Sequence, residues 1–162
     1  MTVLIMGYPD SGKSALAERV TEELSAPGKR IYLATMIPCG EEGAARVERH
    51  RKMREGKGFV TVEAPFDVAE ALEDAADQTV LLECVSNLAA NEMFERGKSA
   101  EETVAAVTAD IAGLAASAEN LVIVSNHFEI TPEFDKETIL YARAMDRINE
   151  ELAAAADRVI RL

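Results

Sequence analysis

Short apolar runs alternate with longer segments of helical periodicity along the whole chain. The apolar runs, which we interpret as strands, occupy residues 2–6, 30–34, 59–63, 79–84, 121–125 and 158–162. The segments with helical spacing occupy residues 13–25, 41–54, 67–76, 87–95, 100–117 and 136–155. Strands that are apolar throughout and separated by helices are typical of a parallel sheet covered on both faces. The pattern therefore predicts an α/β fold, a three-layer sandwich around a mostly parallel sheet.

The length of the chain suits one domain with one sizeable core. It has 162 residues, of which 48% are hydrophobic and 28% are charged, as in soluble globular proteins. Pro27-Gly28 separates the first helix from the second strand, and no linker, repeat or low-complexity tract divides the sequence. We therefore expect a single nucleotide-binding domain over residues 1–162.

The segment between the first strand and the first helix has the sequence of a phosphate-binding loop. Residues 7–14 match the pattern G-x-x-x-x-G-K-[ST], in the strand–loop–helix context that the pattern requires. The alternative is an ordinary glycine-containing turn. The match predicts a P-loop NTPase-like domain in which the nucleotide contacts Gly7, Tyr8, Pro9, Asp10, Ser11, Gly12, Lys13 and Ser14.

Each residue type in this loop suits a different part of a nucleoside triphosphate. Gly7 and Gly12 allow a tight turn and a close approach of the backbone to the phosphates. Lys13 is the expected catalytic cation at the outer phosphates, and the Ser14 hydroxyl is the expected ligand of Mg²⁺. Asp10 is unusual because it brings a carboxylate to an anion site. The loop works if Asp10 points outward, and nucleotide affinity falls if it points inward.

An acidic residue ends the fourth apolar run. Glu83 follows Val80-Leu81-Leu82, and ligands of parallel sheets bind beyond the carboxyl ends of the strands. A carboxylate there is costly without a partner such as a cation. Glu83 is therefore the second expected ligand of Mg²⁺, and the alternative is a solvent-exposed acid at a strand end.

The second helical segment is strongly basic. Six of the 17 lysines and arginines lie within residues 46–57, although the net charge of the chain is −12. Arg46, His50 and Arg54 are spaced by four and share one helix face. Neighbouring arginines favour the neutral form of His50, which can act as a nucleophile, and they can hold the phosphate that it attacks. The alternative is a solvated basic helix that carries an incidental histidine.

Net charge, the length of the apolar runs and the cysteine spacing argue against several other classes of protein. A net charge of −12 argues against a nucleic-acid partner, because phosphate contacts dominate such binding. No apolar run approaches the roughly 18 residues of a membrane span, and the N-terminal run lacks a signal-peptide pattern. Cys39 and Cys84 show no metal-binding spacing, so we interpret them as free thiols in a cytoplasmic protein.

An ordered set of blocks over nearly the whole chain resembles the bifunctional adenosylcobinamide kinase/adenosylcobinamide-phosphate guanylyltransferase family of cobalamin biosynthesis. The blocks are Ser11-Gly12-Lys13-Ser14, residues 31–35, Glu42, residues 45–51, Thr61-Val62-Glu63, residues 81–84, Asn91, residues 122–126, Pro132-Glu133 and residues 149–159. A phosphate-binding loop is common to many families. The ordered set is far more specific.

The resemblance implies two reactions. ATP or GTP phosphorylates the aminopropanol hydroxyl of adenosylcobinamide, and GTP then transfers GMP through a histidine to the phosphorylated corrinoid. The family's guanylylated histidine falls on His50, and Glu63 joins the expected nucleotide-binding residues. The resemblance also implies a homo-oligomer, and a corrinoid requires an open site or a site between subunits.

The chain departs from the family pattern at several positions. Tyr8 replaces a glycine and Asp10 replaces an arginine, and residues 127–131 replace a segment that starts Glu-Val-Gly. Asp146 stands where the family has a glycine in the last helix. His127 follows the fifth run and is a candidate for substrate contact or an ordinary loop residue. The departures leave two alternatives open, a small-molecule kinase without guanylyl transfer and a nucleotide- or corrinoid-binding protein without turnover.

Overall fold

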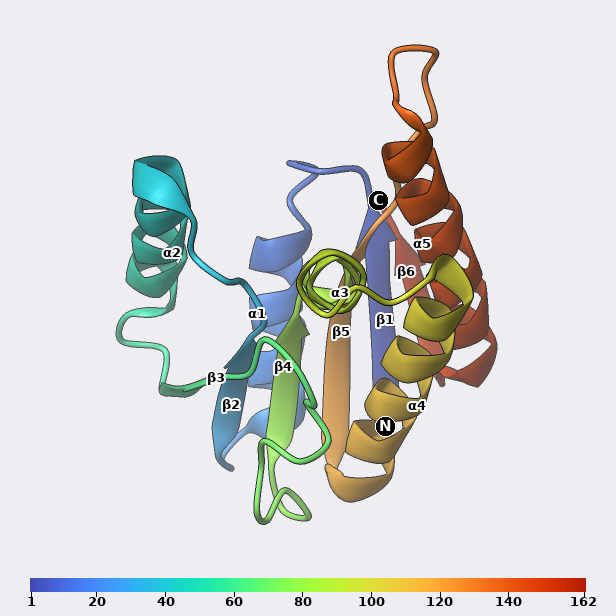
Figure 1. The fold of residues 1–162 in the computed structure, drawn as a ribbon. Helices are drawn as coiled ribbons and strands as arrows, with labels where there is room; N and C mark the ends of the chain where they lie inside the picture. The colour runs from blue at the N-terminus through green and yellow to red at the C-terminus, as the bar shows by residue number, and fades with distance from the viewer.

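The computed structural model describes residues 1–162 and contains one six-stranded sheet whose strands are all parallel. The strand order is β3-β2-β4-β5-β1-β6 (Figure 1). The strands are β1 (Thr2–Gly7), β2 (Arg30–Ala34), β3 (Phe59–Glu63), β4 (Thr79–Glu83), β5 (Asn120–Asn126) and β6 (Arg158–Arg161). All six lie where the apolar runs predicted them, which confirms the α/β sandwich.

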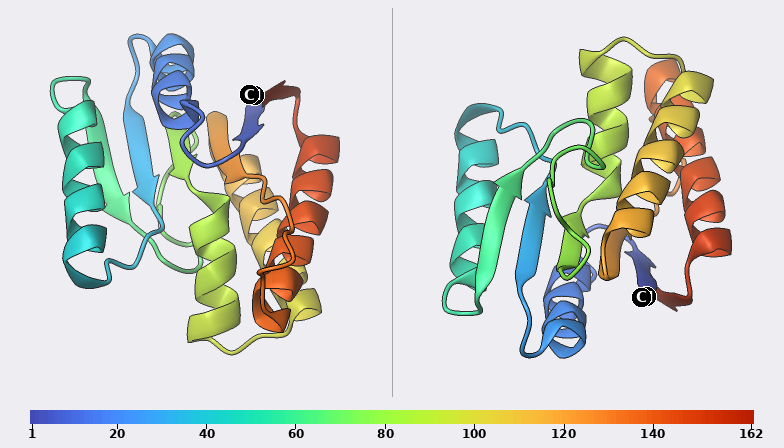
Figure 2. Two further views of the ribbon diagram at one scale, coloured as in Figure 1. Left: turned by 90° about the horizontal axis from the view of Figure 1, so that it is seen from above. Right: turned by 90° about the horizontal axis from the view of Figure 1, so that it is seen from below.

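Alternate residues of the strands divide the core between the two faces of the sheet. Val3 and Ile5 of β1 pack with Ala17 of α1 on one face. Leu4 between them belongs to the larger cluster on the other face, together with residues of α3, α4 and α5. Because successive side chains of a strand point to opposite faces, strands that are apolar at every position bury both faces. Figure 2 shows the sheet between these two helical layers.

The helices are α1 (Lys13–Ser25), α2 (Gly40–Arg54), α3 (Val85–Ala90), α4 (Ala100–Ser117) and α5 (Lys136–Ala155). A π-helical turn, η1 (Asn91–Glu95), continues α3, so the single helix expected over 87–95 begins earlier and changes its winding. The helix α2 stands apart from the sheet beside β2 and β3, whereas α5 lies at the opposite end (Figures 1 and 2). No helix is long and apolar enough to cross a membrane.

The prediction of a helix over residues 67–76 is wrong, because this segment consists of turns and bends. Asp67 has a φ of 54°, in the left-handed region, and its carboxylate pairs with Arg96. The N–H groups of Val68 and Ala69 donate to the carboxylate of Asp110, at 2.8 Å each. The Asp110 carboxylate on α4 therefore fixes the backbone of these turns through a long-range contact. Local periodicity does not contain such a contact.

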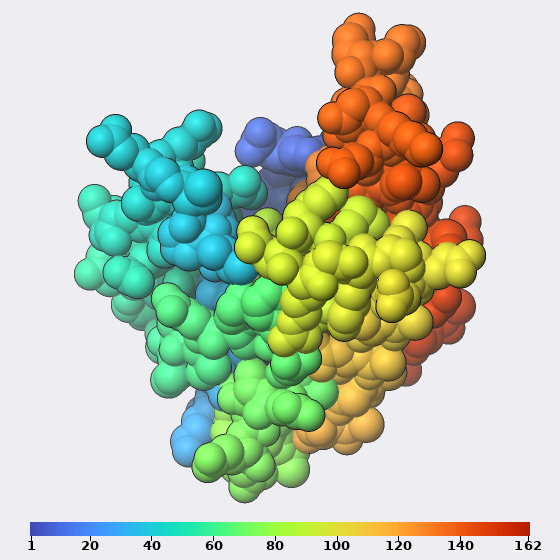
Figure 3. Space-filling view, viewed as in Figure 1, coloured from blue at the N-terminus to red at the C-terminus, as the bar shows by residue number.

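The register of the sheet brings the carboxyl ends of its strands to one edge. Glu83 and Glu63 both pair with Ala34 of β2, and Gly7 pairs with Asn126. At this edge the α2 helix and the segment before α5 rise on either side of the loop that follows β1 (Figure 1). The space-filling view shows the blue N-terminal loop at the floor of an open notch between these two projections (Figure 3). Parallel sheets bind their ligands at this edge.

Candidate functional site

The phosphate-binding loop has the strand–loop–helix form that its sequence predicts. It begins where β1 ends at Gly7 and closes at Gly12, whose φ of 86° lies in the left-handed region. A Cβ at Gly7 would lie 2.8 Å from Ser11 Oγ and 3.1 Å from the carbonyl oxygen of Leu162. Both glycines are therefore required by the backbone, one by conformation and the other by a close approach.

The loop borders a cavity of about 320 Å³, which we call the phosphate pocket. Its walls include residues 9–15 of the loop and also Arg46, Arg49, His50, Met53, Glu83, Cys84, Val124 and Asn126. A helix N-terminus and cationic side chains meet in this cavity, which is the electrostatic environment that bound phosphates need. The structure therefore brings the predicted loop, the basic helix and Glu83 to one place.

Lys13 lies across the loop. Its side chain is only 5% exposed, and its ammonium donates to the carbonyl oxygen of Tyr8 at 2.5 Å and to Ser11 Oγ at 3.3 Å. Burial lowers the pKa of Lys13, and the nearby carboxylates of Glu83 and Asp10 oppose that shift. The ammonium is thus held at the phosphate pocket by uncharged oxygens, which the charged oxygens of a phosphate would outcompete.

Asp10 and Pro9 form the outer rim of the loop. Asp10 has a φ of 59°, is exposed and borders the phosphate pocket. Solvent therefore screens its carboxylate, which weakens its repulsion of phosphate without removing it. The arrangement lies between the outward and inward alternatives that the sequence left open.

Glu83 connects the loop to the rest of the site. Its Oε1 accepts a hydrogen bond from Ser14 Oγ and lies 3.6 Å from His50 Nδ1, and its Oε2 accepts from the Tyr32 hydroxyl at 3.0 Å. The side chain is 9% exposed, so the alternative of a solvent-exposed acid is wrong. Burial and the Glu83 charge both raise the pKa of Tyr32, which keeps its hydroxyl a donor.

Ser14 and Glu83 form an oxygen pair suited to a magnesium ion. The hydrogen bond between them brings a hydroxyl and a carboxylate oxygen together beside the phosphate pocket. No group of three or more His, Cys, Asp or Glu side chains is arranged to hold a metal. Two protein oxygens fit Mg²⁺, which keeps most of its waters and takes further ligands from substrate phosphates.

Arg46 and Arg54, the two arginines expected beside His50, lie in different environments. Arg46 borders the phosphate pocket, whereas the Arg54 guanidinium lies 3.4 Å from the centre of the Tyr32 ring and donates to Thr61 at 3.2 Å. Arg54 is 7% exposed, and its Nη1 has no hydrogen-bond partner. The charged group that lies at ion-pair distance from His50 is Glu83, which the expectation from helix spacing did not include.

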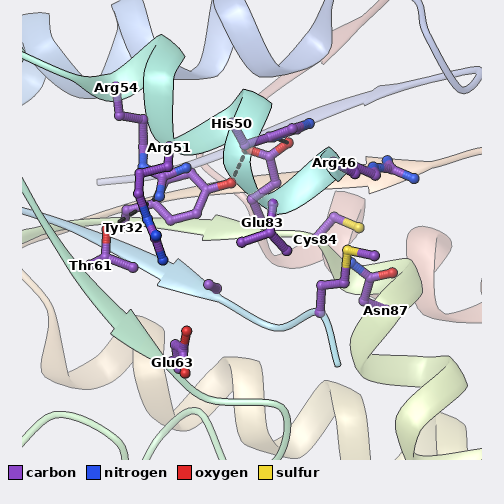
Figure 4. Close-up of a pocket in the computed structure, with 13 residues that line it drawn as sticks. Tyr32, Arg46, His50, Arg51, Arg54, Thr61, Glu63, Glu83, Cys84 and Asn87 are labelled. Carbon is purple, nitrogen blue, oxygen red and sulfur yellow. Dashed lines mark hydrogen bonds and ion pairs between the residues drawn. The ribbon is translucent and has the colours of Figure 1, made fainter. Parts of the chain in front are cut away.

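A second cavity lies under α2, between His50 and β3, and we call it the α2 pocket. Its volume is only about 60 Å³, and Arg51, Arg54, Tyr32, Thr61 and Glu63 contribute to its wall. In Figure 4 Arg51 and Arg54 lie beside the Tyr32 ring, and Glu63 lies at the far end from His50. Arg46, His50, Glu83 and Cys84 border both this cavity and the phosphate pocket.

Sequence reasoning did not identify Tyr32 as a site residue. It lies in the run Ile31-Tyr32-Leu33, which has the composition of a core strand, and the structure does bury it. The one signal in the sequence is a hydroxyl within an apolar strand, since a buried tyrosine needs a partner for its O–H. The partner, Glu83, lies 51 residues away.

His127 lies on the other side of the loop from His50. Its ring packs edge-on against Tyr8 with centroids 5.3 Å apart, and its Nδ1 lies 3.4 Å from Asp146 Oδ1. Asn126 borders the phosphate pocket and donates to Ser86 at 2.7 Å. Asn149 accepts from Ser125 and donates to the carbonyl of Asn126, so it supports the end of β5.

Comparisons with known proteins show the family to which the chain belongs. The family model described as "Cobinamide kinase / cobinamide phosphate guanyltransferase" (CobU) matches residues 3–162. The chain is 32% identical to the bifunctional adenosylcobalamin biosynthesis protein CobU of Escherichia coli strain K12, and 29% identical to the protein of the same name in Salmonella typhimurium strain LT2. Each alignment covers 98% of this chain and 93% of the relative. With its phosphate-binding loop and adjoining histidine, this chain belongs to the cobinamide kinase / cobinamide phosphate guanyltransferase family of transferases.

Proposed function

We propose that this chain phosphorylates adenosylcobinamide with a nucleoside triphosphate and then transfers GMP from GTP, through His50, to the product. The observation that carries the proposal is the position of His50, which borders the same cavity as the phosphate-binding loop and lies 3.6 Å from a carboxylate that also contacts the loop. The name of the family supplies cobinamide, cobinamide phosphate and guanyl transfer, and the name of the two relatives supplies the link to adenosylcobalamin biosynthesis.

In the first reaction the hydroxyl oxygen of the corrinoid side chain attacks the γ-phosphorus. The bond from that phosphorus to the bridging oxygen breaks, the nucleoside diphosphate leaves, and the hydroxyl proton is lost to solvent. Lys13 and the N–H groups of the loop stabilise the charge that develops on the phosphate oxygens. We assign the magnesium ligands to Ser14 and Glu83, and the bound ion would neutralise phosphate charge.

In the second reaction a nitrogen of His50 attacks the α-phosphorus of GTP. The bond to the β-phosphate oxygen breaks, pyrophosphate leaves, and GMP remains on the imidazole. An oxygen of the corrinoid phosphate then attacks the same phosphorus, and the P–N bond breaks to release His50. Nδ1 faces Glu83, so Nε2 is the attacking nitrogen and the carboxylate stabilises the cationic ring of the adduct.

The guanosine of the adduct extends toward the α2 pocket, because that cavity shares His50 with the phosphate pocket. Glu63 at its far end is suited to accept hydrogen bonds from the N1 and N2 groups of guanine. A volume of about 60 Å³ holds only a few waters, at about 10–15 Å³ each, which is less room than a purine needs. Arg54 or α2 must therefore move before guanine can enter.

Incubation with α-labelled GTP and Mg²⁺ tests the guanylylation. We expect label on the protein that is stable in alkali and labile in acid, and we expect His50→Ala to remove it. Lys52→Ala is the matched control, because Lys52 is an exposed cation of α2 that borders neither the phosphate pocket nor the α2 pocket. An unlabelled wild-type protein that still binds GTP would overturn this part of the proposal.

A kinase without guanylyl transfer is the second candidate. It is favoured by Asp10, whose carboxylate borders the phosphate pocket where the family pattern has an arginine. Formation of adenosylcobinamide phosphate without any labelled protein would support this candidate. Turnover of either kind would exclude a protein that only binds its ligands.

A further inference from the structure

A third cavity adjoins the phosphate-binding loop on the side away from α2. It has a volume of about 510 Å³, and we call it the β6 pocket because Arg161 and Leu162, at the end of β6, form part of its wall. It also includes Gly7 and Tyr8, whereas the phosphate pocket begins at Pro9. The two cavities meet again between Asn126 and His127. They are therefore direct neighbours along the edge of the sheet.

The wall of the β6 pocket has the chemistry of a site for an aromatic, polar ligand. Met6, Ala153 and Leu162 supply apolar surface. The rings of Tyr8 and His127 stand at the mouth, and they are 51% and 47% exposed. An apolar base with a few polar groups and a volume of several hundred Å³ is typical of small-molecule sites.

Two charged side chains of the β6 pocket are free to contact a ligand. Glu150 and Arg161 border the cavity, and neither makes an ion pair or hydrogen bond through its side chain. Asp146 is held by His127. A purine nucleoside presents N–H donors, ring acceptors and ribose hydroxyls, which a free carboxylate and a free guanidinium can both engage.

We propose that the β6 pocket holds the base and ribose of the triphosphate that donates its γ-phosphate in the kinase step. The proposal rests on the proposed function and adds a second nucleoside position to it. One phosphate-binding loop would then serve two nucleoside orientations. The guanosine linked to His50 lies toward α2, and the nucleoside of the phosphoryl donor lies toward β6.

The direction of phosphoryl transfer supports this arrangement. The attacking hydroxyl and the leaving oxygen lie roughly in line on opposite sides of the γ-phosphorus. A nucleoside in the β6 pocket therefore places the acceptor on the α2 side of the loop, where His50 lies. The new corrinoid phosphate forms beside the histidine whose GMP it must attack. A nucleoside under α2 would instead direct the acceptor away from His50.

The size of the two cavities supports the same assignment. In this conformation the α2 pocket offers about 60 Å³, whereas the β6 pocket offers about 510 Å³. Of these two cavities, the β6 pocket therefore has the larger space for a nucleoside in this conformation. Tyr8, His127 and Asp146 are also three of the positions where the sequence departs from the family pattern, and they contact one another. We therefore expect the selectivity of this pocket to depend on these three residues.

Binding of non-hydrolysable ATP and GTP analogues to the whole protein tests the proposal without turnover. We expect Tyr8→Ala and His127→Ala each to weaken binding of the preferred analogue about tenfold, since a base stacks on exposed aromatic rings. Tyr8→Phe keeps the ring and should restore affinity. Glu129→Ala is the matched control, because Glu129 is exposed on the same loop and does not border the pocket.

Inorganic tripolyphosphate is the second probe, because it fills the phosphate pocket and has no nucleoside. Its affinity should not change in Tyr8→Ala or His127→Ala, and an equal loss for tripolyphosphate and nucleotide would overturn the proposal by showing a distorted loop. The His127 N–H donates to the Gly7 carbonyl at 2.9 Å through the backbone, a contact that the alanine variant keeps.

Steady-state kinetics then distinguish the donor from the acceptor. We expect Tyr8→Ala and His127→Ala to raise the KM for the phosphoryl donor, and Glu63→Gln to raise the GTP concentration needed for labelling of His50. A raised KM for adenosylcobinamide with an unchanged donor KM would assign the pocket to the acceptor and overturn the proposal. Absence of kinase activity in the wild-type protein would count against the proposed function, and the binding measurements would still decide what the pocket holds.

Discussion

At the scale of single residues, Glu83 has the most connections in the site. One oxygen meets Ser14 and His50, and the other accepts from Tyr32. A buried carboxylate is stable only where donors or cations compensate its lost hydration. The loop, the basic helix and β2 each supply one such partner. Glu83 therefore connects Ser14, the other expected magnesium ligand, to His50, the expected nucleophile.

Replacement of Glu83 by glutamine should impair both reactions. The change keeps the shape and removes the charge, and hydrogen bonds to charged groups contribute about 1.5–3 kcal/mol, which corresponds to about 10- to 100-fold in rate. Tyr32→Phe, which removes one neutral donor, should cost less than about tenfold. Rates of phosphorylation and of His50 labelling check this order. Equal rates in Glu83→Gln and wild type would contradict the role of the charge.

At the scale of elements, long-range polar contacts decide where helices stop. The segment 67–76 has helical spacing, yet Asp110 of α4 captures the N–H groups of Val68 and Ala69. By contrast α4 begins where its sequence predicts, because Ser99 and Glu102 form a local capping box. Local signals are therefore sufficient for α4 and insufficient for 67–76.

Asp110→Ala should lower the free energy of unfolding by about 2–3 kcal/mol, because it leaves two partly buried N–H groups without an acceptor. Urea denaturation monitored by circular dichroism measures the loss. Asp77→Ala is the control, since Asp77 is an exposed acid in the neighbouring turn with no polar contact through its side chain. A similar stability for the two variants would show that these hydrogen bonds do not hold the segment.

At the scale of the whole molecule, the site consists of two parts, the phosphate-binding loop at the sheet and the helix α2 beside it. The phosphate-binding loop is joined to the central strands β1 and β5, whereas α2 with His50 stands beside the sheet. Side chains such as Glu83 and Arg54 connect the two parts. Ligands that bridge the parts should therefore stabilise the fold as a whole.

A non-hydrolysable GTP analogue at about 100 times its Kd should raise the free energy of unfolding by about 2.7 kcal/mol. For a chain of this size the Tm should rise by roughly 5–10 °C. Lys13→Ala should lose most of that shift, and omission of Mg²⁺ should reduce it. Thermal denaturation with and without each component measures these effects. A shift of the same size in Lys13→Ala would contradict the assignment of the phosphate pocket.

The sequence by itself determined the six strands, the loop at residues 7–14 and the basic helix that carries His50. These features depend on neighbouring residues, whose periodicity and spacing the chain displays directly. Only the tertiary structure decided that Tyr32 holds Glu83, that Glu83 reaches His50, and that 67–76 remains unwound. Each of these contacts joins residues more than 30 positions apart. The strand order that brings them together depends on packing of the whole sheet, which no local pattern contains.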